Sequence, residues 1–144
     1  MSEEITNPKS RSRLYAVQSL YAKQIDDSTN LDAVIEALTI TEKKGKQKVI
    51  KHTQAILEIA VAEQNSIDSI IKVNSSKPKE VPTQNPLVYS ILLAALAEML
   101  KFEEVDKRII ISEYLNIAAG FFDRPEISFI NAVLDKFSNS SGKQ

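Results

Sequence analysis

Three cations near the amino terminus have types and spacing that suit a specific chemistry. Lys9, Arg11 and Arg13 fall within five residues, and no acidic residue occurs between Ile5 and Ile25. If a helix begins after Asn7, these positive charges oppose its dipole at the N-terminus. Because these charges lower helix stability and have no evident structural role, phosphate binding would account for them. A solvated, charged helix end explains the same pattern, so both interpretations stay open.

A second basic run follows further along the chain and is denser than the first. No aromatic residue is interleaved with it, so nothing in the run could stack on bases. A solvated loop and helix face is the favoured interpretation, and auxiliary phosphate contact is the alternative. Its cations are Lys43, Lys44, Lys46, Lys48 and Lys51.

Residues suited to catalysis are few. The chain has no cysteine, which excludes thiolate metal sites and a cysteine nucleophile. His52 is the only histidine and has no acidic or nucleophilic partner at motif spacing, so a structural or exposed role is expected. Glu103, Glu104 and Asp106 read as surface charge in a short connection. The sequence therefore predicts no enzyme, no metal and no cofactor.

The elements that would position these residues follow helical periods. Residues 87–102 are apolar on every side when wound as a helix, which predicts the central helix of a helical domain. Asn7 and Asn30 are suited to cap the first two helices, and Ser66 to cap the fourth. Further helices are expected near residues 48–64, from 107, and after 123, with a proline-rich connector at 75–86.

Length and composition indicate one domain. The chain has 144 residues, of which 43% are hydrophobic, and a net charge of −1. We expect an all-α fold of about seven helices in two packed bundles, with loose ends at 1–7 and 138–144. The first ten residues lack the apolar core of a signal peptide, which fits a cytoplasmic protein.

Two stretches resemble the NusB family of bacterial transcription antitermination factors. Residues 12–24 read SRLYAVQSLYAKQ, similar to the family's basic arm followed by Ala-Val-Gln-Ala-Leu-Tyr. Residues 107–137 begin KRIIISE and close on FINAVLDK, similar to the family's Lys-Val-Ala-Ile-Asn-Glu and Phe-Val-Asn-Gly-Val-Leu-Asp-Lys. The two motifs stand in the family's order and near the expected ends of the chain.

The resemblance implies a non-catalytic helical adaptor. Its partners would be boxA-like single-stranded RNA of ribosomal RNA leaders, the small-subunit ribosomal protein NusE and the elongating RNA polymerase complex. No membrane is implied, and a homodimer stays open.

The resemblance also implies an RNA-binding set. Phe129 matches a base-contacting phenylalanine, and its position off the apolar stripe would leave the ring free to stack. Phe121 matches a second aromatic, although it also continues the core stripe of its helix. Tyr21 is expected in the core by its spacing. The set is Lys9, Arg11, Arg13, Gln24, Phe121 and Phe129. Three cationic contacts would give a log–log salt slope of about −2 on single-stranded RNA.

Departures from the family pattern leave alternatives. Ser128 stands where a lysine is usual, and Ser10 and Ser12 interrupt the basic arm. These departures motivate a second hypothesis, a protein-interaction scaffold of the same fold with weak or lost RNA binding. A third interpretation, a fragment of an RNA methyltransferase with a similar N-terminal domain, ranks last because no cofactor-binding domain follows.

Overall fold

The computed structural model describes residues 7–75 and 85–141. Within them the chain forms seven α-helices and no strand, which confirms the expected all-α class. None of these helices is both long enough and apolar enough to cross a membrane. In chain order the helices are α2 (Pro8–Ile25), α3 (Leu31–Thr41), α4 (Lys46–Ala62), α5 (Gln64–Asn74), α7 (Pro86–Lys101), α8 (Lys107–Ala119) and α9 (Arg124–Ser141).

Side-chain caps set where several helices begin. The Asn7 carboxamide oxygen accepts hydrogen bonds from the backbone N–H of Lys9 and Ser10, and that of Asn30 accepts from Ala33, as the sequence predicts. Asn85 caps α7 and Asp106 caps α8 in the same manner, and neither was expected. Each cap satisfies N–H groups that the helix itself leaves unpaired.

Two expected boundaries are wrong. The fourth helix begins at Gln64 and not after Ser66, because only Glu63 separates α4 from α5 and no new cap is needed. The last helix continues to Ser141, so residues 138–141 are helical where a loose tail was expected. Most of the connector expected at 75–86 lies outside the described residues.

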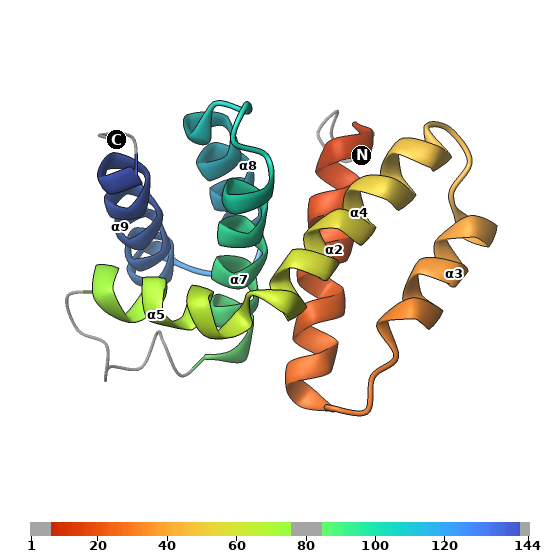
Figure 1. Ribbon diagram of the computed structural model, residues 1–144, viewed down its shortest axis with the longest axis horizontal. Coiled ribbons are helices and arrows are strands. Elements are labelled where there is room, and N and C mark those ends of the chain that lie inside the picture. The colour runs from red at the N-terminus through yellow and green to blue at the C-terminus, as the bar shows by residue number, and fades with distance from the viewer. Residues whose placement is uncertain (1–6, 76–84, 142–144) are drawn as a thin grey trace.

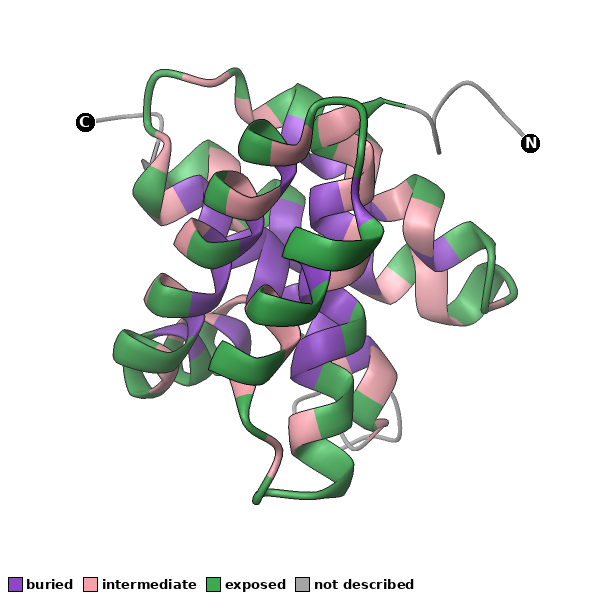
Figure 2. Ribbon diagram, turned by 90° about the vertical axis from the view of Figure 1, so that its right-hand side faces the viewer, coloured by how far each residue is buried: buried purple, intermediate pink, exposed green. Residues whose placement is uncertain are grey.

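The helices pack as two groups around α7 (Figure 1). One group holds α2, α3 and α4, and the other holds α5, α8 and α9. Helix α7 contacts α2 and α4 on one side and α5, α8 and α9 on the other. Its residues 90–99 are all buried, which confirms it as the central helix. Buried positions accordingly run through the middle of the molecule (Figure 2). Helix α3, which lies at the right-hand side of Figure 1 and faces the viewer in Figure 2, is largely exposed.

Candidate nucleic-acid interface

A buried carboxylate, Glu98 of α7, organises the contact between α2, α4, α7 and α8. The Arg13 guanidinium donates to both of its oxygens, with the Nη2–Oε2 distance at 2.6 Å. The Tyr114 hydroxyl donates to Oε1 at 2.8 Å, and His52 Nε2 lies 3.3 Å from Oε2. Arg13 also reaches Glu113 on α8 at 2.9 Å. Four helices are therefore joined through one polar cluster inside the core.

The pKa values in this cluster follow from its burial and pairing. Burial by itself would raise the pKa of Glu98, but hydrogen bonds from His52 and Arg13, together with their positive charge, lower it to about 2. Burial and the neighbouring Glu98 carboxylate hold the pKa of Tyr114 well above its usual range. Burial alone would lower the pKa of Arg13, but the hydrogen bond to Glu98 together with the charges of Glu98, Tyr114 and Glu113 outweighs it and raises the pKa. Glu98 and Arg13 are therefore both ionised in the folded protein.

Arg13 thus has a place that the sequence did not predict. The residue is only 4% exposed, so its charge neutralises Glu98 and does not face a solvent-borne phosphate. The expectation that the charges of the first helix bring no structural return is wrong for Arg13. The physical reason is a partner 85 residues away in the sequence.

Arg11 is also paired. Its guanidinium donates to Glu42 Oε1 at 3.0 Å and to the carbonyl oxygen of Lys44 at 2.7 Å. The Tyr15 hydroxyl donates to the other Glu42 oxygen, and this hydrogen bond raises the pKa of Tyr15. Arg11 therefore fastens the lysine-rich segment after α3 to the first helix. The two basic stretches of the sequence are joined in space.

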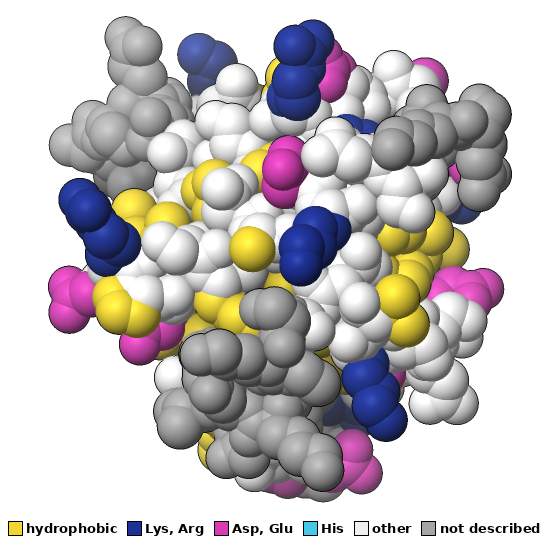
Figure 3. Space-filling model, turned by 90° about the vertical axis from the view of Figure 1, so that its left-hand side faces the viewer, with side chains coloured by type: hydrophobic (Ala, Val, Ile, Leu, Met, Phe, Trp, Pro, Cys, Tyr) yellow, Lys and Arg dark blue, Asp and Glu magenta, His cyan; other side chains and the backbone are white. Residues whose placement is uncertain are grey.

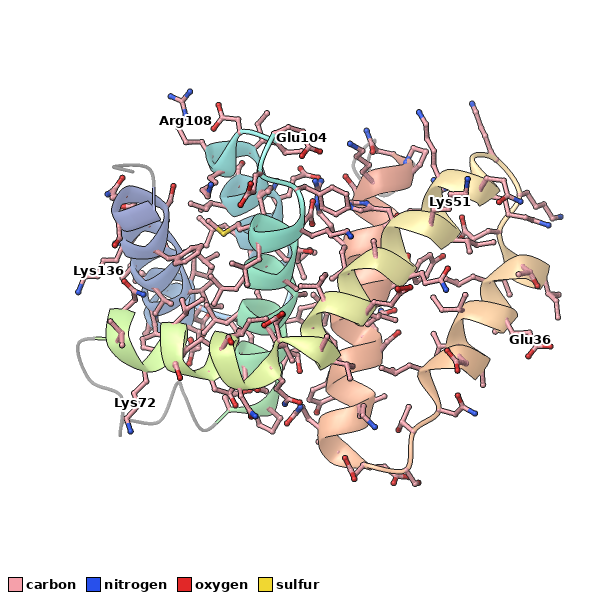
Figure 4. The ribbon with its side chains drawn as sticks, in the orientation of Figure 1. Glu36, Lys51, Lys72, Glu104, Arg108 and Lys136 are labelled. Atoms are coloured by element: carbon pink, nitrogen blue, oxygen red, sulfur yellow. The ribbon has the colours of Figure 1, made fainter. Side chains whose placement is uncertain are left out.

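Lys9 is the exposed cation of the arm, and other lysines gather beside it. Lys48 and Lys51 of α4 and Lys101 at the end of α7 line the same pocket as Lys9. Figure 4 shows Lys51 on α4 and Glu104 after α7, both in the upper half of the molecule. On the face that carries α5 and α9, by contrast, Lys and Arg side chains are scattered (Figure 3). Positive charge therefore concentrates near the N-termini of α2 and α4.

The aromatic and amide residues of the expected site lie elsewhere. Phe121, after α8, is 52% exposed, which resolves its two interpretations in favour of an accessible ring. Phe129 is half-buried against the core, so its ring is only partly free. Tyr21 is 38% exposed, and its expected core position is wrong. Gln24 is exposed in the last turn of α2.

These residues do not form one compact site. Lys9 and Gln24 stand at opposite ends of α2, roughly 22 Å apart along its axis at 1.5 Å per residue. The start of α2, which holds Lys9, and the α7–α8 connection lie at the same end of the molecule (Figure 1). A single ligand that touched all of them would have to be extended. Sequence reasoning missed Lys101 and Phe102, because only the fold brings residue 9, residues 48–55 and residues 98–105 together.

No group of three or more His, Asp or Glu side chains among the described residues is arranged to hold a metal ion. The polar cluster around Glu98 is held together by hydrogen bonds among Arg13, Glu98 and Tyr114. The site therefore offers charge and shape for binding.

Comparison with known proteins agrees with this fold. The model of the NusB family matches residues 10–139. A protein of Rickettsia bellii named transcription antitermination protein NusB is 28% identical, over 98% of this chain and 96% of its own length. One of the same name from Mesorhizobium japonicum is 30% identical, over 92% and 89%. A solved structure of T. maritima NusB has a TM-score of 0.74 and 20% identity, over 92% of each chain. This protein belongs to the NusB family.

Proposed function

We propose that the protein is a transcription antitermination factor that binds boxA-type single-stranded RNA together with NusE and joins the elongating RNA polymerase. The observation that carries this proposal is family membership over nearly the whole chain. Relatives that match over more than nine-tenths of this chain are named for antitermination. The protein acts in this proposal as a non-catalytic adaptor.

The arrangement of side chains supports an extended RNA path. Lysines at one end of α2 suit phosphate groups, and the exposed ring of Phe121 suits stacking on a base. Gln24 and the partly exposed Phe129 supply further polar and aromatic contacts. Single-stranded RNA can follow such a spread because its unstacked bases reach separate sites.

The first test is binding of the purified protein to a boxA-like RNA and to a scrambled RNA, with and without NusE. Selective binding that NusE strengthens is the expected result. Phe121→Ala and Phe129→Ala should each lower the affinity by about 1–3 kcal/mol, the usual contribution of one stacked base. Ile40→Ala, which truncates an exposed apolar residue of α3, is the control and should have no effect. Equal affinity for both RNAs would contradict sequence-specific binding.

A specific observation favours a second function, a protein scaffold with little RNA binding. Two of the three arm cations, Arg11 and Arg13, are held in ion pairs. Deletion of the arm would also break the Glu98 cluster, so Lys9→Glu is the sharper variant. In the scaffold function, NusE binds equally to wild type and Lys9→Glu, and neither binds RNA. If the proposed function holds, the Lys9→Glu variant still binds NusE but binds RNA more weakly than wild type.

A further inference from the structure

A pocket of about 360 Å³ lies where the N-terminal turns of α2 and α4 approach the end of α7. Its size falls at the lower end of the range for small-ligand sites. Residues from three separate parts of the chain line it, and the ones that matter here are Lys9, Lys48, Lys51, His52, Lys101 and Phe102.

The rim of this pocket is positive. Its four lysines make no ion pair with any residue that the structure describes, and the side chain of each is available to a ligand. Glu104 is the one acidic residue on the rim, and Glu98 at the base is neutralised by Arg13. The balance favours a ligand that carries negative charge.

His52 leaves a polar atom unsatisfied in this pocket. Its side chain is only 10% exposed, and its Nδ1 is buried with no hydrogen-bond partner among the described residues. Nε2 faces the Glu98 carboxylate, and the ring packs edge-to-face on Phe102 with centroids 5.4 Å apart. These two contacts hold the ring in an orientation in which Nδ1 has no partner among the described residues.

The chemistry of Nδ1 narrows the class of ligand. Glu98 is ionised and can only accept, so the proton between the two groups sits on His52 Nε2. Nδ1 then accepts a hydrogen bond when the ring is neutral and donates one when the ring is charged. A nucleobase edge or a ribose hydroxyl can pair with Nδ1 in either state, because each offers both a donor and an acceptor, whereas an ionised phosphate can pair only with the charged ring.

We propose that this pocket holds one nucleotide of a single-stranded RNA. The phosphate lies on the lysines, the base or ribose forms a hydrogen bond with His52 Nδ1, and Phe102 with Ala55 gives the apolar wall that a base requires. This inference rests on the proposed function and extends its RNA contacts from Lys9 to the beginning of α4 and the end of α7.

The first test compares two double variants that remove the same charge. Lys51→Ala with Lys101→Ala empties half of the rim, whereas Lys43→Ala with Lys44→Ala removes two exposed lysines outside the pocket. The pocket variant should bind boxA-like RNA about tenfold more weakly at fixed salt, and the control should lose less than about threefold. Equal losses in both would overturn the pocket and leave only general charge attraction.

The second test reads His52 directly, and the chain makes it unambiguous because it has one histidine. In nitrogen-15 NMR of the wild-type protein, the Nδ1 resonance should shift on addition of boxA-like RNA. Nucleoside monophosphates should shift it in the same direction with lower affinity. Inorganic phosphate should leave it unchanged, and a full shift with phosphate alone would show a plain anion site.

The two proposals fail in different ways. RNA binding with an unmoved His52 resonance overturns the pocket and leaves the proposed function standing. A shift with nucleoside monophosphates but no RNA binding leaves a site for a free nucleotide and overturns both the RNA ligand of the pocket and the proposed function. No binding of either ligand overturns both.

Discussion

Glu98 joins α7 to three other helices inside the core. It receives hydrogen bonds from Arg13 and Tyr114 and faces His52, and it is 1% exposed. A buried ion pair of this kind adds little net stability compared with an apolar core, but the loss of one partner leaves an uncompensated charge. The cluster therefore fixes how four helices meet.

Glu98→Gln should lower the free energy of unfolding by roughly 3 kcal/mol, because it leaves the buried Arg13 charge with Glu113 alone. Urea unfolding of the two proteins measures this difference. Glu103→Gln, an exposed carboxylate in the α7–α8 connection, is the matched control and should behave as wild type. A loss no larger than that of the control would show that the cluster does not couple the helices.

The same residue predicts how stability depends on pH. The pKa of Glu98 is about 2 in the folded protein against an ordinary value of 4.5. As the pH falls below about 4.5, the Glu98 carboxylate becomes protonated in the unfolded chain but stays ionised in the folded protein until about pH 2. Stability is therefore full above the higher value and falls through this interval, by up to about 3 kcal/mol.

Unfolding measured between pH 5 and pH 2 tests this expectation. The Glu98→Gln variant has no carboxylate at the position and should show a shallower decline than wild type over the same interval. Parallel curves for the two proteins would mean that other carboxylates carry the acid response.

At the scale of elements, the beginning of α4 decides where the pocket lysines stand. Gly45 precedes this helix with a φ of +71°, in the left-handed region that glycine adopts at little cost. A Cβ at this position would lie 2.9 Å from Pro8 Cγ at the beginning of α2. The first turns of α2 and α4 thus approach each other closely only because residue 45 is a glycine.

Gly45→Ala should therefore destabilise the protein by about 1–2 kcal/mol for the left-handed backbone alone, and the contact with Pro8 should add to this loss. Thermal or urea unfolding measures it. Gly120→Ala is the comparison, because Gly120 has a φ of −75° and an added Cβ there meets only the Ile117 carbonyl oxygen at 3.3 Å. If Gly120→Ala proved the more damaging change, the close approach of α2 and α4 would not be the constraint.

At the scale of the whole molecule, positive charge is concentrated locally. The net charge is −1, yet four lysines gather around one pocket, while on the face of α5 and α9 the cations are scattered (Figure 3). RNA binding should therefore depend on a local group of lysines and not on a general positive field.

This distribution changes the expected salt dependence. With Arg11 and Arg13 in ion pairs, the phosphate contacts pass to Lys9, Lys48, Lys51 and Lys101, and four contacts give a log–log slope of about −3 on single-stranded RNA. The variant with Lys51→Ala and Lys101→Ala should show about −1.5, and the Lys43→Ala, Lys44→Ala control should keep the wild-type slope. Titrations at several salt concentrations measure the slope, and a value near zero in wild type would exclude these contacts.

The sequence by itself determined the helices and the centre of the fold. Caps such as Asn7 and Asn30 and the all-round apolar run of α7 act over a few residues, so they can be recognised locally. The family motifs likewise lie in continuous stretches, and the family match over residues 10–139 confirmed them.

Only the tertiary structure decided which charges are available to a ligand. Arg13 and Lys9 look alike in the sequence, but one is buried on Glu98 and the other lines an open pocket. The partners of Arg13 and His52 lie 85 and 46 residues away, and Phe102 and Lys101 reach the pocket from a third segment. No local sequence pattern predicts these contacts, because they form only when α7 packs between the two helix groups.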